Sequence, residues 1–269
     1  MIILKNGLKR IAMSKFDVSV VISTIARKNL LRAVRSIFCQ NYSGRIQILI
    51  GVDFDIGGAN SLCKQLMEEC PNNISITWLD LGYSTSIRHG GVHTSYYGGS
   101  LRTALSFLAN SEYILYLDDD DWLLEGHIKS MMNIIDDNCW AFSYSYYADG
   151  DTSTPLHIDE IESVGVNVGV YQKNFGGFVR PSGLLLNKMK TMHLLHLWSI
   201  ALTEDGDGED RNIFNYLKSM AHACSKRATV CVSIDPQDGN HALRSNFLKS
   251  KGVHYSSSSK ADSSRMGKL

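Results

Sequence analysis

The sequence predicts an α/β protein with a mostly parallel central sheet flanked by helices. Four short apolar runs, rich in β-branched residues, have the character of strands buried on both faces: residues 18–23, 46–52, 74–79 and 113–117. Segments with apolar residues at helical spacing lie between these runs. Because strands that alternate with helices are joined by right-handed crossovers, the four strands are expected to be parallel.

The connecting segments of the first half complete this pattern. Residues 30–38, 61–69 and 101–110 have the spacing of amphipathic helices that follow the first, second and third strands. Residues 82–99 are instead rich in Gly, Ser, Thr and Tyr, which predicts a long surface loop. Long loops in compact domains often carry function.

The second half of the chain is less regular. The patterns predict helices at 125–136 and 211–223 and strands at 140–147, 164–171 and 229–234. Residues 184–202 are interpreted as a packed amphipathic helix, although their Lys and His residues would also suit contact with a membrane. Apolar residues become sparse from about residue 250, where a flexible tail is expected.

The composition excludes several classes of protein. Lys and Arg together number 27, as do Asp and Glu, so the chain lacks the basic excess of a general nucleic-acid binder. The six cysteines show no CxxC pair or zinc-site spacing, and several lie in apolar runs, which predicts buried free thiols in a reducing compartment. No signal peptide is evident at the start, and no apolar run reaches the about 20 residues that span a bilayer. A cytoplasmic protein is expected, and peripheral contact with the inner face of the membrane stays open.

Four consecutive aspartates, residues 118–121, follow the fourth predicted strand directly. Carboxylates this close repel one another, and a divalent cation such as Mn²⁺ or Mg²⁺ removes that cost. Because alternate residues of an extended segment point the same way, Asp118 and Asp120 are expected to face one side together. The alternative is a solvated acidic turn that caps a helix. A calcium loop is disfavoured, since the glycine and regular ligand spacing of that motif are missing.

The segment 113–122, Tyr-Ile-Leu-Tyr-Leu-Asp-Asp-Asp-Asp-Trp, resembles the signature of the family 2 inverting glycosyltransferases. That family has the glycosyltransferase-A fold, which consists of two abutting Rossmann-like halves. The resemblance implies that Asp118 and Asp120 hold the metal on the diphosphate of a nucleotide-sugar donor. It also implies a nucleotide-sugar-binding half at 1–121 and an acceptor-binding and catalytic-base half at 122–249, ahead of the flexible tail that composition predicts at 250–269.

Further stretches match the same family in the expected order. Thr24 and Arg27 lie where the family contacts the nucleotide, although the usual proline before the Ser/Thr is absent. Asp53 matches the aspartate that binds the base, and its alternative role is a strand-end cap. Arg102 matches an arginine ahead of the metal-binding strand, with Thr103 in place of the usual asparagine. Arg102 would contact the diphosphate or pair with a nearby acid.

A Gly-Glu-Asp-Arg stretch, residues 208–211, resembles the motif that supplies the catalytic base. The resemblance implies that Asp210 is the base and that Glu209 orients the acceptor, whereas simple capping of a helix is the alternative. His241 is a weaker candidate for a further metal ligand. Six aromatic residues would form either an acceptor platform or part of the core, and they are Tyr144, Tyr146, Tyr147, Phe175, Phe178 and Trp198.

The predicted function is transfer of a sugar from a nucleotide-diphosphate-sugar to a hydroxyl of a glycan or lipid-linked acceptor. The resemblance implies inversion at the anomeric carbon and favours a UDP-sugar. Two alternatives stay open. A sugar nucleotidyltransferase would favour a glycine-rich first loop, which residues 24–28 lack. A non-catalytic nucleotide- or glycan-binding module would not require Asp210.

Overall fold

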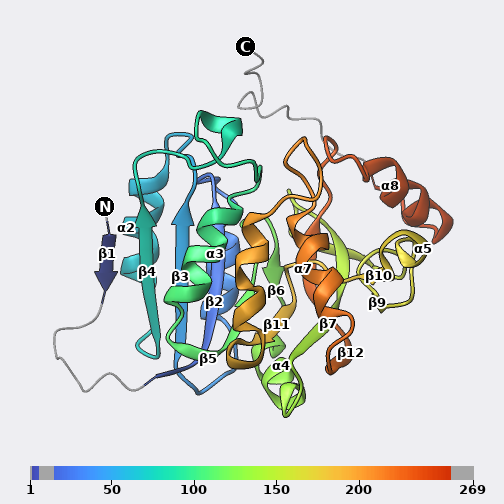
Figure 1. Cartoon of the computed structure of the whole chain (residues 1–269), viewed down its shortest axis with the longest axis horizontal. Coiled ribbons are helices and arrows are strands. Elements are labelled where there is room, and N and C mark those ends of the chain that lie inside the picture. The colour runs from blue at the N-terminus through green and yellow to red at the C-terminus, as the bar shows by residue number, and fades with distance from the viewer. Residues whose placement is uncertain (1, 6–14, 256–269) are drawn as a thin grey trace.

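The computed structural model describes residues 2–5 and 15–255, and within them ten strands form one mixed sheet (Figure 1). These strands are β1 (Ile2–Lys5), β2 (Phe16–Thr24), β3 (Ile46–Val52), β4 (Ile74–Asp80), β5 (Ser111–Tyr116), β6 (Trp122–Leu123), β7 (Trp140–Asp149), β8 (Thr154–Ile158), β11 (Leu184–Asn187) and β12 (His222–Ser233). A separate two-stranded sheet is formed by β9 (Gly165–Val166) and β10 (Gly177–Phe178).

The described helices lie between these strands along the chain. They are α1 (Leu30–Phe38), α2 (Ala59–Glu69), α3 (Gly99–Leu108), α4 (His127–Ile135), α5 (Gln172–Phe175), α6 (Lys188–Thr191), α7 (Glu209–Leu217) and α8 (His241–Ser250). Two 3-10 helices, η1 (Ile87–His89) and η2 (Met192–Ser199), complete the set.

The sheet has the order β1-β4-β3-β2-β5-β11-β7-β12-β6, with β8 beside β7. The pairs β4–β3, β3–β2 and β2–β5 are parallel, which confirms the prediction for the first half of the chain. The second half differs, because β11 runs antiparallel to both β5 and β7 and thereby joins the two halves. The parallel direction returns where β7 pairs with β12.

Apolar side chains of alternate strand residues fill two cores, one on each face of the sheet. Val20 and Ile22 of β2 belong to the core that includes Leu30 and Val34 of α1. Val21, between them in sequence, belongs to the other core, which includes residues of α3, η2 and α7. In Figure 1, α3 and α7 lie in front of the strands. A strand buried on both faces therefore has the continuous apolar sequence that predicted it.

The region 184–202 corrects one prediction, because it is not a single amphipathic helix. Its first four residues form β11, all buried between β5 and β7, and α6 and η2 follow. Pairing on both sides decides the conformation here, since an apolar run of this length fits a central strand as well as a helix. Within the described residues, no helix has the length and apolar character required to cross a membrane.

Other elements in the second half also begin or end at residues that differ from the predicted ones. The helix predicted at 211–223 is α7, which begins at Glu209 and ends at Leu217. The following strand β12 starts at His222, so it takes up the end of that predicted helix as well as the strand predicted at 229–234. Of the strand predicted at 164–171, only Gly165 and Val166 are extended and paired.

The structure also tests what the sequence predicted for the cysteines, for six aromatic residues and for the tail. All six cysteines are free, as predicted, but the predicted burial is wrong for four of them: only Cys63 and Cys231 are buried, and Cys39 is exposed. Of the six aromatic residues, Tyr147, Phe178 and Trp198 are buried and Tyr144, Tyr146 and Phe175 are partly buried, so core packing accounts for at least half of them. The predicted tail begins where α8 ends at Ser250, and residues 256–269 lie outside the described residues.

Candidate active site

Three polar segments meet at the carboxyl ends of the parallel strands. Thr24 ends β2, Asp53 follows β3, and the aspartate run begins two residues after β5. Hydrogen bonds connect them directly: the Asp53 amide donates to the Thr24 carbonyl oxygen at 2.8 Å, and Thr24 Oγ1 donates to Asp119 Oδ2 at 2.6 Å. This edge of an open α/β sheet is where ligands bind in such folds.

The four aspartates alternate between buried and exposed positions. The side chains of Asp118 and Asp120 are 33% and 28% exposed, whereas Asp119 and Asp121 are almost fully buried. Asp119 is held by Thr24, and Asp121 Oδ1 accepts a hydrogen bond from the Ser233 amide of β12 at 3.1 Å. The buried pair therefore anchors the segment, while the exposed pair remains accessible.

The acids of this run raise one another's pKa. Burial is the largest cause for Asp120, and with the neighbouring charges of Asp119 and Asp118 it raises the pKa to about 6 against the opposing effect of Arg27. Burial together with Asp120 and Asp118 places the pKa of Asp121 well above its ordinary value. The negative charge of the four aspartates is therefore only partly compensated by the positive charge of the neighbouring arginines.

Two arginines contact the aspartate run. Arg27 forms ion pairs with Asp119 at 2.6 Å and with Asp120 at 3.2 Å. Arg102, which is almost fully buried on α3, pairs with Asp118 at 2.7 Å and lies 4.9 Å from the ring of Trp198. Of the two roles predicted for Arg102, pairing with a nearby acid is the one that the structure shows.

Glu209 and Asp210 occupy the first turn of α7, behind Gly208 in the left-handed conformation with φ of 87°. Burial, followed by the charge of Asp210, raises the pKa of Glu209 to about 8, and its Oε2 has no hydrogen-bond partner among the described residues. Burial also raises the pKa of Asp210, whose Oδ1 accepts from the Arg211 amide at 2.7 Å.

The charge of Arg102 connects the two acidic motifs. Its guanidinium is paired with Asp118, and it also lowers the pKa of both Glu209 and Asp210. The aspartate run and the start of α7 lie about 90 residues apart in sequence, yet they share this one cation. The Arg102 guanidinium therefore lies within electrostatic range of both the aspartate run and the start of α7.

Asp53 is buried beside a loop that sequence reasoning did not resolve. Thr85 Oγ1 lies 3.4 Å from Asp53 Oδ1 and 2.5 Å from Ser100 Oγ. The exposed ring of Phe54 stacks on His89 of η1, with centroids 4.4 Å apart. The Gly/Ser/Tyr-rich composition of residues 82–99 indicated a functional loop, but nothing in it identified these particular contacts.

The same loop also reaches the segment ahead of α7. The Tyr96 amide donates to the Gly206 carbonyl oxygen at 3.0 Å. Gly206 has φ of 84°, and a Cβ on it would lie 2.1 Å from the Thr94 carbonyl oxygen. Another contact missed from the sequence is Ser182, whose Oγ accepts from the Asp118 amide at 3.0 Å. Residues 82–99 thus connect the Asp53 side of the site to Glu209 and Asp210.

Residues 19–192, more than half of the chain, match the model of a protein family described as Glycosyl transferase family 2. The chain belongs to glycosyl transferase family 2. A search of curated protein sequences found no match.

Solved structures with the same fold include enzymes with nucleotide-sugars bound. S. aureus TarS 1–349 aligns with this glycosyltransferase at 15% identity and a TM-score of 0.56, covering 89% of this chain and 67% of that one. The alignment with the complex of TarS 1–349 and UDP-GlcNAc covers 84% of this chain and 60% of that one. The mannosyltransferase PcManGT from Pyrobaculum calidifontis, in complex with GDP-Man and Mn²⁺, has a TM-score of 0.59 at 12% identity over 90% and 66%.

These similarities show the glycosyltransferase-A fold, as predicted. The longer S. aureus TarS chain is only 40% covered, so this glycosyltransferase spans about two thirds or less of the proteins it matches.

His241 is the first residue of α8, the helix at the right-hand edge of the molecule in Figure 1. Its Nε2 lies 3.2 Å from Ser245 Oγ. Across the part of the chain that the structure describes, no three His, Cys, Asp or Glu residues are grouped so as to hold a metal. His241 is therefore not grouped with Asp118 and Asp120, and its role as a ligand stays a prediction.

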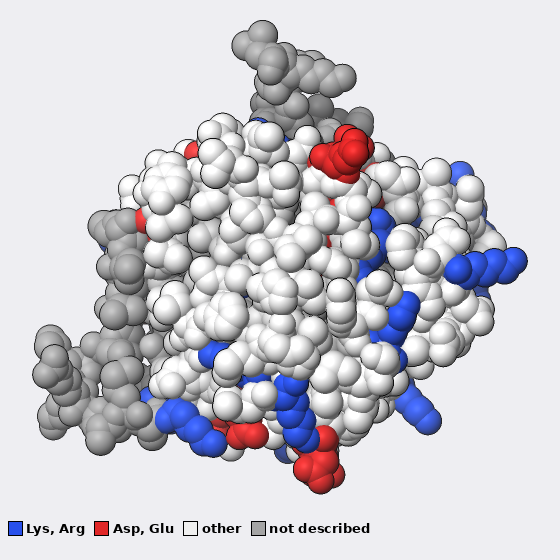
Figure 2. Space-filling model, in the orientation of Figure 1, with Lys and Arg blue, Asp and Glu red and all other residues white. Residues whose placement is uncertain are grey.

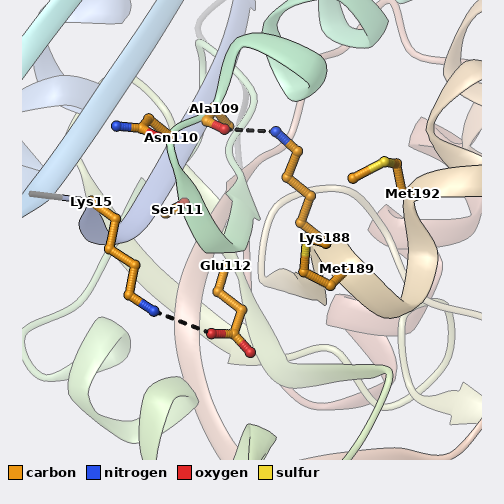
Figure 3. Close-up of a pocket in the computed structure, with 8 residues that line it drawn as sticks. All are labelled: Lys15, Ala109, Asn110, Ser111, Glu112, Lys188, Met189 and Met192. Atoms are coloured by element: carbon orange, nitrogen blue, oxygen red, sulfur yellow. Dashed lines mark hydrogen bonds and ion pairs between the residues drawn. The ribbon is translucent and has the colours of Figure 1, made fainter.

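A cavity of about 310 Å³ lies at the opposite edge of the sheet, near the start of β5 (Figure 3). Lys188 lines it and donates from Nζ to the carbonyl oxygens of Phe107 and Ala109, at the end of α3. Lys15 pairs there with Glu112 at 3.5 Å. Because Lys188 satisfies the last carbonyls of a helix, its position has a structural reason, and the cavity is separate from the aspartate run.

Proposed function

We propose that this glycosyltransferase moves a sugar from a nucleotide-diphosphate-sugar to a hydroxyl of a glycan or lipid-linked acceptor, with inversion at the anomeric carbon. The observation that carries this proposal is the position of Arg102, which is paired with Asp118 and acts electrostatically on Glu209 and Asp210. A donor held at the aspartates would thus lie close to a candidate base.

The exposed aspartates fit a divalent cation. Asp118 and Asp120 offer hard oxygen ligands from one segment, and Mg²⁺ and Mn²⁺ commonly bind one or two carboxylates together with substrate phosphates. The hydrogen bonds that the described chain makes to them use Asp118 Oδ1 and Asp120 Oδ2. When bound, the cation neutralises the charge that develops on the departing diphosphate. Arg27 and Arg102 would assist by contacting the same phosphate oxygens.

Asp210 is the proposed base. The acceptor hydroxyl forms a bond to the anomeric carbon, its proton passes to the Asp210 carboxylate, and the bond from that carbon to the diphosphate oxygen breaks with its electron pair. A raised pKa suits this task, because a base works best when its pKa lies near the operating pH. Glu209, more deeply buried and with a pKa of about 8, is suited to hold the acceptor by donating a hydrogen bond.

The proposed donor base is uracil, held by Asp53. Solved structures of this fold carry both UDP- and GDP-sugars, so the fold alone does not select the base and the residues around Asp53 would do so. Thr85 engages Asp53 Oδ1, which leaves Oδ2 for a ligand. A single oxygen suffices for the one imide N–H of uracil, whereas the two neighbouring donors of guanine would need both oxygens, with Oδ1 serving Thr85 as well.

A donor screen tests this function. The protein is incubated with Mn²⁺ and each of several UDP-, GDP- and dTDP-sugars, and the released nucleoside diphosphate is measured with and without EDTA. We expect turnover of a UDP-sugar that EDTA abolishes. Turnover that EDTA leaves unchanged would contradict the metal assignment, preference for a GDP-sugar would contradict the base assignment, and release from no donor would contradict the function.

A further inference from the structure

Arg211 is a cation beside the proposed base that the reaction above does not use. It follows Asp210 on α7, and its guanidinium lies 5.5 Å from the ring of Tyr171 and 5.4 Å from the ring of Phe175. Within residues 15–255, no acid lies at ion-pair distance from it; the guanidinium is hydrogen-bonded to the Tyr171 side chain, and its buried Nε has no hydrogen-bond partner. It differs in this from Arg27 and Arg102, which are paired with aspartates.

The rings of Tyr171 and Phe175 position the guanidinium of Arg211 without neutralising its charge. Tyr171 precedes α5 and Phe175 ends it, so both rings come from a short lobe that packs against α7. Cation–π contact is favourable by about 1 kcal/mol, yet a buried N–H without a partner costs about 1–3 kcal/mol. A ligand oxyanion that accepts from this arginine would remove that cost.

A second cation lies farther along the same helix. Lys218 caps the end of α7, and its Nζ donates to the Phe175 carbonyl oxygen at 2.9 Å. Seven residues separate it from Arg211, which places the two about 10 Å apart along the axis on one face of the helix. Figure 2 shows basic side chains following one another in the strip between α7 and the lobe of α5, β9 and β10.

Two of the four acids near this strip, Glu209 and Glu162, contribute little negative charge to it. Glu209 is largely protonated near neutral pH because burial raises its pKa to about 8. Glu162, which lies close to Tyr171, is already paired with Arg244 at 2.6 Å. Asp207 and Asp210 remain as the acids whose charges act on Arg211.

Asp210 lies under the influence of two different arginines. Arg102 comes from α3 and is tied to Asp118 on the proposed donor side, whereas Arg211 packs on the lobe of α5. An acceptor that presents a hydroxyl to Asp210 opposite the donor would extend over Arg211.

Building on the proposed function, we propose that the acceptor carries an oxyanion, a phosphate or a carboxylate, and that Arg211, which lies beside the rings of Tyr171 and Phe175, is the residue that selects it. The neutral remainder of the acceptor would be recognised less strongly, since a charge-assisted hydrogen bond is about twice as strong as a neutral one.

Binding of small acceptor analogues tests this inference. The protein is first saturated with UDP and Mn²⁺, so that phosphate probes cannot occupy the donor site. Glucose 6-phosphate, glucuronic acid and glucose are then titrated and their affinities measured by NMR. We expect at least one of the two anions to bind about tenfold more tightly than glucose. Preference for only one of the two would identify the anion as phosphate or carboxylate.

Variants assign the effect to Arg211. Arg211→Gln should weaken binding of the preferred anion about tenfold and leave UDP binding unchanged, and Arg211→Lys should retain part of the preference. Lys64→Met, which removes an exposed cation on α2, is the matched control and should change neither affinity. Equal affinity for the three probes, or an anion preference unchanged in Arg211→Gln, would overturn the inference. Absence of UDP binding to the parent protein would instead contradict the proposed function itself.

Discussion

The four side chains of the aspartate run have two different roles: one pair fixes the segment in the fold, and the other pair carries negative charge at the surface. Asp119 and Asp121 are buried and bonded to Thr24 and Ser233, while Asp118 and Asp120 remain partly exposed with an arginine each. The arginines reduce the repulsion between the carboxylates without burying them. The divalent cation of the proposed function would find two ligands whose backbone is already fixed, which would reduce the entropy lost on binding.

Glu209 gives a prediction about pH at this scale. Its pKa is about 8 in the folded protein against an ordinary value of 4.5, so the folded state binds the proton more tightly than the unfolded state. The free energy of unfolding therefore falls as pH rises from 4.5 towards 8. Because glutamine cannot ionise, Glu209→Gln should raise the free energy of unfolding by about 2–4 kcal/mol more at pH 8 than at pH 5.

Urea unfolding of both proteins at the two pH values measures this difference. Glu68→Gln, which makes the same chemical change at an exposed position on α2, serves as the control for the substitution itself. An effect of Glu209→Gln that is the same at pH 5 and pH 8 would show that Glu209 is ionised in the folded protein.

At the scale of elements, the loop of residues 82–99, here called the strap, contacts Asp53 through Thr85 and the segment ahead of α7 through Tyr96. Gly206 is the closest point of contact, because its positive φ and its approach to the Thr94 carbonyl oxygen leave no room for a Cβ. Gly206→Ala should displace this contact and reduce transfer activity at least tenfold, with a smaller effect on donor binding. Kinetic constants for donor and acceptor would show this.

Gly239→Ala provides the comparison for Gly206→Ala. A Cβ on Gly239 would meet nothing within 4 Å, so full activity is expected. If both variants behave like the parent protein, the strap does not position Glu209 and Asp210.

The helix α8 is held to the second half by buried charges. Arg244 pairs with Glu162 at 2.6 Å, and Glu162 also accepts from the Tyr147 hydroxyl. Removal of one partner of a buried pair leaves the other uncompensated, so Arg244→Ala should lower the free energy of unfolding by about 3 kcal/mol. Arg35→Ala, which breaks an exposed pair with Glu69, should cost about 1 kcal/mol or less. Equal costs in chemical unfolding would contradict this account of the cluster.

Elements with a clear period could be predicted from the sequence, and those decided by pairing could not. The strands β2 to β5 and the aspartates after β5 follow from apolar runs and their ends. β11 was missed because an apolar run flanked by helical residues gains its identity only from β5 and β7 on either side. Thr85 and Ser182 were missed for a similar reason, since a single hydroxyl carries no pattern until the fold places it beside Asp53 or Asp118.

Across the whole molecule, one continuous sheet links the two halves predicted from the sequence. The proposed division at residue 121 falls between β5 and β6, yet β11 from the second half pairs with β5 from the first. The carboxyl ends of β2, β3 and β5 and the start of α7 are therefore held by one framework. Such a framework can keep a donor and a proton acceptor in register through a reaction.

The most direct test compares donor binding and sugar transfer in two variants that separate these roles. Binding of the UDP-sugar selected by the donor screen is measured by calorimetry with Mn²⁺, and transfer is measured on the same samples. Asp120→Ala should lose metal-dependent donor binding, because one of two proposed ligands is removed. Asp210→Asn should bind the donor as the parent protein does and transfer the sugar about a hundredfold more slowly, since asparagine cannot take the proton. Full transfer by Asp210→Asn would contradict the account.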